Sequence, residues 1–277
     1  MSFQFPVPDV LGGITVLRDQ PYFVNWHPRQ KLDLYVPQHA DHPLPLIIWI
    51  HGGAWLEGSK AEYAPLEYLA EGYAVASLNY RLSQHAIFPA QIEDCKAAVR
   101  WLRANARSYN LDPQRFAAWG ASAGGHLVAL LGVTGEVSDF EVGKNLSVSS
   151  QVQAVVDYFG PTDFLQMDAQ RAPDGVLHDA AHSPESRLVG GWIRQFPERV
   201  AKASPLTYVT SRAAPFLIVH GDHDPIVAYP QSQLLENALK KAGVPVTFYT
   251  VQGGGHGGFT DPQVAEVTKE FLEKYLK

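Results

Sequence analysis

One serine in this chain lies in a setting typical of a catalytic nucleophile. Ser122 is the centre of Gly120-Ala-Ser-Ala-Gly124, which follows an apolar run ending at Trp119 and opens an apolar helical stretch. G-x-S-x-G between a strand and a helix makes a sharp turn that exposes the serine hydroxyl at the carboxyl edge of a sheet. The alternative is a small-residue turn that only lets a strand and a helix pack closely. The strand-turn-helix context favours the nucleophile.

A serine hydroxyl needs a base, which in folds with this motif follows an acid later in the chain. His256 meets that order within the glycine-rich run 253–258, after the last expected strand. Asp222 and Asp224 both follow the strand expected over 216–220. We prefer Asp224 as the acid, because a carboxylate a few residues beyond the strand end can reach back toward the histidine loop. Asp222 is then expected to make turn hydrogen bonds to nearby amides.

Acyl transfer also needs hydrogen-bond donors for the tetrahedral oxyanion. His51-Gly-Gly-Ala-Trp55 follows the apolar run 46–50, as the first such loop should, and its small side chains expose backbone amides. We expect the amides of Gly53 and Ala54 to donate, together with that of Ala123, which follows the serine. Taken alone, the run also fits a plain glycine turn.

Two other binding sites deserve consideration, and we expect neither. Gly253, Gly255 and Gly258 match the dinucleotide spacing G-x-G-x-x-G, but that fingerprint needs a further βα unit with an acidic residue, and one helix follows here. His178 and His182 stand four apart, and a second cluster of histidine and aspartate covers 220–224. Neither cluster has an established zinc ligand set. The sequence therefore predicts no metal and no cofactor.

Short apolar runs alternate with helical patterns, which is typical of βαβ units and a mostly parallel sheet. The expected strands cover 32–36, 46–50, 74–78, 115–119, 154–158, 216–220 and 246–251, and the expected helices 62–71, 89–106, 124–131, 230–242 and 262–276. The stretch 162–205 lacks a clear strand and is expected to form a lid or substrate-binding insertion. We expect a single α/β domain over 1–277.

Composition excludes several classes of partner. The 28 acidic residues outnumber the 22 Lys and Arg residues, and no block of like charge could follow a nucleic-acid backbone or an anionic membrane. Residues 1–10 lack the pattern of a signal peptide, so the expected location is the cytoplasm unless a leader was removed. The single cysteine, Cys95, lies in an apolar helical stripe and is expected to be buried. The oligomeric state, homo-oligomer included, stays open.

Taken together, these motifs resemble the hormone-sensitive-lipase-like esterases of the α/β-hydrolase fold. The likeness rests on His51-Gly-Gly-Ala-Trp, Gly120-Ala-Ser-Ala-Gly-Gly125, His220-Gly-x-x-Asp224 and His256-Gly-Gly-Phe259. Within that group, Asn79-Tyr-Arg-Leu82 and the helix with Asp94 are most similar to bacterial carboxylesterases related to feruloyl and acetyl xylan esterases. One departure is Ala54, which replaces the usual third glycine. Its methyl group narrows the pocket against bulky tertiary-alcohol esters.

The resemblance implies a serine carboxylesterase with a small-molecule ester substrate, acting on short acyl groups such as acetyl or feruloyl esters of plant carbohydrate. Ser122, Asp224 and His256 would form its triad. Trp55, Tyr80, Phe159 and Trp192 are candidates for the pocket wall, and Asp94 is expected to be a structural acid. An arylformamidase shares the histidine-glycine-glycine motif and the serine turn. A ligand-binding receptor on the same scaffold is disfavoured, because such receptors lack the histidine that His256 supplies.

Overall fold

The structure is a computed structural model that describes residues 12–23 and 27–277, so the expectation about a leader in 1–10 lies outside the described residues. The described residues form an eight-stranded sheet in the order β1-β2-β4-β3-β5-β6-β7-β8. The pairs β1·β2 and β2·β4 are antiparallel, and all other pairs are parallel. The strands are β1 (Ile14–Pro21), β2 (Lys31–Pro37), β3 (Leu44–Ile50), β4 (Ala74–Leu78), β5 (Leu111–Ala121), β6 (Ala154–Tyr158), β7 (Phe216–Gly221) and β8 (Val246–Val251).

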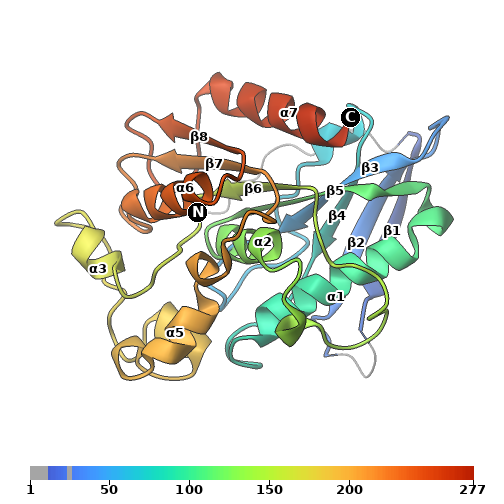
Figure 1. The fold of residues 1–277 in the computed structure, drawn as a ribbon. Coiled ribbons are helices and arrows are strands. Elements are labelled where there is room, and N and C mark those ends of the chain that lie inside the picture. Colours follow the sequence, from blue (N-terminus) through green and yellow to red (C-terminus); the bar gives the residue numbers. More distant parts are fainter. Residues whose placement is uncertain (1–11, 24–26) are drawn as a thin grey trace.

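Helices cover both faces of this sheet, as Figure 1 shows. One face carries α1 (Ala90–Ala104), α2 (Ala123–Val133) and α6 (Pro230–Lys241), and the other carries α7 (Pro262–Leu276) with the short 3₁₀ helix η1 (Leu66–Leu69). Every residue of β3 is buried, as expected for a central parallel strand covered on both sides. The predicted α/β fold with a mostly parallel sheet is confirmed.

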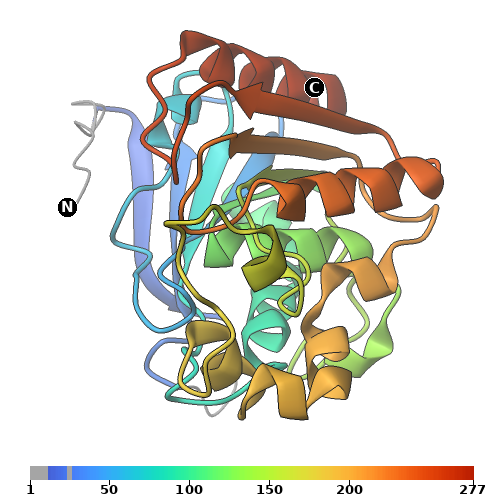
Figure 2. The same cartoon turned by 90° about the vertical axis from the view of Figure 1, so that its left-hand side faces the viewer.

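The stretch 162–205, all of it described, forms no strand. It holds α3 (Met167–Gln170), α4 (Pro184–Val189) and α5 (Pro197–Ala203), joined by loops and short 3₁₀ turns. Figures 1 and 2 show these helices beyond α2 and α6, on the face of the sheet opposite α7. The base of the insertion is anchored where Ser204 Oγ donates to the Thr162 carbonyl. Its far part contacts the loop after β7, where the Val176 amide donates to the Pro225 carbonyl.

Two expectations about elements are wrong. The helix expected over 62–71 is reduced to η1, because Pro65 lacks the amide that an internal helical turn needs. Strand β1 was not expected. It is an exposed antiparallel edge strand whose register shifts between Leu17 and Gln20, where Asp19 has φ 55°. That irregularity interrupts the alternation by which a strand is recognised. Among the described residues, no helix has the length and apolar character of a membrane span.

Candidate active site

The serine turn forms where β5 ends and α2 begins. Ser122 has φ 58° and ψ −123°, a strained conformation that is held because its amide donates to the Tyr158 carbonyl of β6 at 2.9 Å. The turn packs too closely for a side chain at Gly120, where a β-carbon would lie 2.5 Å from the Gly124 carbonyl oxygen. The small residues of the motif therefore allow the helix to start directly beneath the serine.

Three residues distant in sequence meet at this edge of the sheet. His256 Nε2 lies 3.0 Å from Ser122 Oγ, and His256 Nδ1 lies 2.7 Å from Asp224 Oδ2. The Asp224 side chain is fully buried, whereas the His256 side chain is 16% exposed and so is open to a substrate. This is the arrangement in which an imidazole can take a proton from a serine hydroxyl while a carboxylate fixes its tautomer.

The Asp224 carboxylate accepts four hydrogen bonds. Oδ1 accepts from the amides of Ile226 and Val227 at 2.8 and 3.0 Å, and Oδ2 accepts from His256 and from His220 Nε2 at 3.1 Å. Burial alone would raise the pKa of this carboxyl, but the hydrogen bonds from His220 and His256 hold the pKa well below its ordinary value. Asp224 is therefore ionised at neutral pH.

Asp222 has a different set of partners. Its Oδ1 accepts from the Gly253 amide at 2.7 Å and from His223 Nδ1 at 2.6 Å. The first of these bonds joins the loop after β7 to the loop that carries His256, and the His223 amide adds a bond to the Gly254 carbonyl. Asp222 thus makes the turn hydrogen bonds expected of it, with one of them holding the two loops together.

The loop after β3 lies against the serine turn. A β-carbon at Gly52 would be 2.9 Å from the Ala121 carbonyl oxygen and 3.4 Å from Ser122 Cβ. Gly53 and Ala54 both have positive φ, at 99° and 52°. Within the described part of the chain, none of the amides of Gly53, Ala54 and Ala123 donates to a protein acceptor. The predicted oxyanion donors therefore have no competing protein acceptor.

This loop is supported by Tyr80, expected at the pocket wall, and by Arg29, which no sequence motif singled out. His51 is buried, its ring stacks on Tyr80 at 4.5 Å, and the Tyr80 hydroxyl donates to the His51 carbonyl at 3.1 Å. Arg29 Nη2 lies 3.1 Å from His51 Nε2 and donates to the Gly58 carbonyl, while its Nε donates to the Tyr80 carbonyl. Because a guanidinium only donates, His51 Nε2 accepts and Nδ1 carries the hydrogen toward the Gly52 carbonyl. Burial lowers the pKa of His51 to about 4, so this pattern persists at neutral pH.

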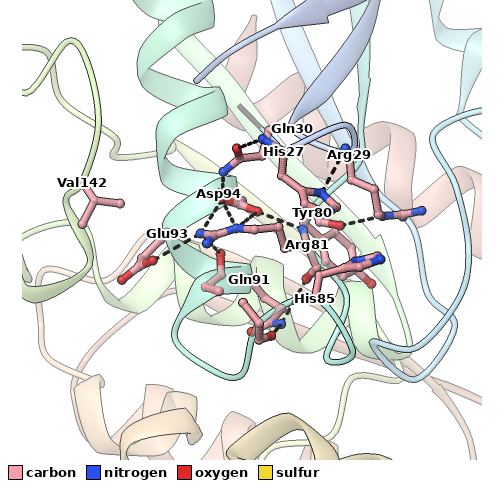
Figure 3. A network of polar contacts seen from close by, with 12 residues as sticks. His27, Arg29, Gln30, Tyr80, Arg81, His85, Gln91, Glu93, Asp94 and Val142 are labelled. Atoms are coloured by element: carbon pink, nitrogen blue, oxygen red, sulfur yellow. Dashed lines mark hydrogen bonds and ion pairs between the residues drawn. The ribbon is translucent and has the colours of Figure 1, made fainter. Parts of the chain in front are cut away.

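A second part of the same network fixes the segment after β4 (Figure 3). Arg81 Nε and Nη2 both donate to the Asp94 carboxylate of α1, and the Arg81 amide donates to it as well. Gln30 Nε2 donates at 2.7 Å to Asp94 Oδ1, which also accepts from Arg81 Nη2. Asp94 is fully buried and makes only structural contacts in this network. Its ion pair holds the chain next to Tyr80, and therefore supports the loop above.

The four candidates for the pocket wall have separate outcomes, and two need correction. Trp55 and Tyr80 are 1% and 0% exposed, so neither lines an open pocket. Trp55, in the loop after β3, packs against the rings of His126 and Phe164, and Tyr80 supports His51. The sequence does not distinguish an aromatic residue that packs inside the protein from one that lines a pocket.

The other two candidates differ in position. The centre of the Phe159 ring lies 4.6 Å from the centre of the His256 ring, so Phe159 packs directly beside the imidazole. The backbone of Phe159 has a positive φ of 45°. Trp192 is half-buried in the insertion, where its Nε1 donates to Asp179 at 2.9 Å. Of the two, Phe159 has a contact with the candidate catalytic residues.

The His178 pair considered as a metal site has another set of contacts. His178 Nδ1 lies 2.8 Å from Glu185 Oε1, and its Nε2 lies 2.8 Å from the Ile226 carbonyl oxygen. Both neighbours are acceptors, so the protonated ring can donate to each of them. Burial lowers the pKa of His178, but the hydrogen bond and charge of Glu185 raise it above its ordinary value. His182 is exposed at the surface. His178 therefore links the insertion to the loop that carries Asp224.

A mostly parallel sheet with a serine turn after β5, an acid after β7 and a histidine after β8 defines an α/β-hydrolase. Comparison with known proteins gives the family, since residues 32–239 match the family model BD-FAE. The chain belongs to the BD-FAE family.

Named relatives agree with this class. The chain is 33% identical over 235 residues to Esterase LipC of Mycobacterium tuberculosis, an alignment that covers 83% of this chain and 57% of that protein. It spans about half the length of the first curated relatives it matches.

Two solved structures are similar over nearly whole chains. A truncated carbohydrate esterase from gut microbiota has a TM-score of 0.86 at 37% identity, with 95% of this chain and 97% of that chain covered. An acetyl ester-xyloside bifunctional hydrolase from Caldicellulosiruptor lactoaceticus has a TM-score of 0.70 at 27% identity, with 88% and 85% covered. The curated relatives and both solved structures named here are described as esterases or ester hydrolases, and the solved structures share the fold of this chain.

Proposed function

We propose that this protein is a serine carboxylesterase that hydrolyses short-chain acyl esters through an acyl-enzyme. One observation carries the proposal: the continuous hydrogen-bonded contact from Ser122 Oγ through His256 to Asp224, at 3.0 and 2.7 Å. The named esterase relatives support the same reaction class.

In the acylation half-reaction, Ser122 Oγ attacks the ester carbonyl carbon as its proton passes to His256 Nε2. The carbonyl oxygen becomes an oxyanion, for which the amides of Gly53, Ala54 and Ala123 are the proposed donors. The ionised Asp224 offsets the charge on the imidazolium. When the intermediate collapses, the carbon–oxygen bond to the alcohol breaks and the alcohol leaves with the proton from His256.

Deacylation repeats these steps with water as the nucleophile. His256 takes a proton from the water as its oxygen attacks the acyl carbon, and the same amides receive the second oxyanion. Collapse then returns the proton from His256 to Ser122 Oγ and releases the acid. No residue other than these is required to move a proton.

For the substrate, we propose acetyl or feruloyl esters of plant carbohydrate. The carbohydrate esterase and the acetyl ester-xyloside hydrolase among the similar structures support this class. The Ala54 methyl group in the oxyanion loop favours small groups at the reacting carbon. The insertion 162–205 is proposed as the part that contacts the alcohol side, because it meets the loop of Asp224 through His178 and Val176.

The test is a substrate panel with purified protein: p-nitrophenyl acetate and palmitate, methyl ferulate, acetylated xylan and a formanilide. We expect kcat/KM to be higher for the acetate than for the palmitate, and acetate release from xylan or hydrolysis of the ferulate. A preference for palmitate would contradict the short-chain proposal. Hydrolysis of the formanilide in preference to every ester would instead indicate an arylformamidase.

A further inference from the structure

A second imidazole contacts the carboxylate of Asp224. His220, the fifth residue of β7, is fully buried, and its Nε2 lies 3.1 Å from Asp224 Oδ2 and 2.9 Å from the Val227 carbonyl oxygen. Its Nδ1 lies 2.7 Å from Ser232 Oγ, on α6. His220 therefore joins the acid of the candidate triad to a helix that carries none of the triad residues.

The identity of these partners fixes where the hydrogens lie. A carboxylate and a carbonyl only accept, so His220 Nε2 must carry a hydrogen. The Ser232 hydroxyl can donate to Nδ1, and this single placement satisfies all three contacts without adding charge to the buried site. The resulting chain of donation runs from Ser232 to His220 to Asp224, and meets His256 at the same carboxylate oxygen.

Sharing that oxygen has a mechanical consequence. The backbone amides of Ile226 and Val227 hold Oδ1, while among the residues that the structure describes only the two imidazoles hold Oδ2. Without His220, the position of Oδ2 would depend on His256 alone, which is the group that must reorient and change charge during catalysis. We propose that His220, held by Ser232, is a positioning residue that fixes the oxygen of Asp224 facing His256.

The inference rests on the proposed triad, and variants at His220 can separate a donor role from a packing role. Gln places an amide hydrogen near the position of Nε2, Asn places one nearer to Nδ1, and Leu removes both while it keeps an apolar volume. Ser232→Ala removes the donor to Nδ1 but leaves both acceptors facing Nε2. The measurements are kcat and KM for p-nitrophenyl acetate, and thermal unfolding.

We expect H220L to lower kcat about 10- to 100-fold with little change in KM, the size expected for losing one hydrogen bond to a charged group. H220Q should recover most of the activity, H220N should not, and S232A should cost less than H220L.

Two results would overturn the inference: normal kcat in a folded H220L, or equal kcat in H220Q and H220N. If H220L does not fold, the comparison of the two amide variants decides. A failure of the triad itself would be seen separately, as an active Ser122→Ala variant. Normal kcat in H220L beside an inactive Ser122→Ala would reject only the positioning role.

Discussion

The two aspartates after β7 have different partners, and exchanging each for asparagine gives a sharp prediction. In Asp224→Asn the single remaining oxygen can continue to accept from the amides of Ile226 and Val227. The new NH₂ group then faces the N–H of His256 and that of His220. Two donors cannot bond each other, so the His256 ring is driven to the tautomer with its hydrogen on Nε2, where it cannot accept the proton of Ser122.

The expected loss in kcat is about 10⁴-fold, which is the cost of the wrong tautomer in a serine hydrolase triad and equals about 5 kcal/mol of transition-state stabilisation. KM should change far less. Asp222→Asn keeps an oxygen that can accept from the Gly253 amide, so its cost should be limited to about 1 kcal/mol of stability.

The assay is steady-state hydrolysis of p-nitrophenyl acetate by both variants, with thermal unfolding to show that each is folded. The two proteins form a matched pair, because the same substitution is made two residues apart in one loop. A crippled D222N beside a nearly normal D224N would refute the choice of acid. A folded D224N within about tenfold of wild-type kcat would refute the tautomer reasoning, since tenfold is only about 1.4 kcal/mol.

Three further predictions concern the surroundings of the site. Arg29→Lys should lower kcat about tenfold in steady-state assays, because one ammonium group cannot replace the guanidinium that contacts both His51 and the Tyr80 carbonyl. This loss is smaller than that expected for removing an oxyanion donor. An unchanged kcat would contradict the prediction. Ala54→Gly should raise kcat/KM for tert-butyl acetate relative to p-nitrophenyl acetate, and an unchanged ratio would show that the methyl group is not the barrier. The hydrogen bonds of His178 should stabilise the folded state fully at pH values below the ordinary histidine pKa of about 6.5. This stabilisation should be lost as the pH rises through the raised pKa of His178. The difference in melting temperature between wild type and His178→Gln should therefore become smaller from pH 5 to pH 9. A difference that becomes larger would contradict a raised pKa of His178.

Much of the fold follows from local patterns in the sequence. Strands β4, β6 and β8 have the predicted bounds. The first two are almost wholly buried and consist mainly of apolar residues, whereas β8 is a half-exposed edge strand that is recognisable by its β-branched and aromatic residues. The serine turn was likewise recognisable, since its glycines and its strand-helix context are contiguous in sequence. An edge strand such as β1, with an irregular register and exposed residues, lacks that signal.

The supports of the site depend on contacts that no local pattern encodes. Arg29 meets His51 across 22 residues, and His220 meets Ser232 across a loop and a helix start. His220 was noticed in a histidine and aspartate cluster and in the motif His220-Gly-x-x-Asp224, but neither indicated its own role, and nothing distinguished Arg29 from other arginines. Burial also separates Tyr80, expected at the pocket, from the open side of the loop.

The most direct test of the account is covalent labelling with a fluorophosphonate, followed by peptide mass mapping. Ser122 alone has its hydroxyl within hydrogen-bond distance of His256, among the described residues, so we expect one label on the peptide that contains Ser122. The label should be absent from Ser122→Ala, which should also lose esterase activity. A label on another serine, together with an active Ser122→Ala variant, would contradict the proposed mechanism.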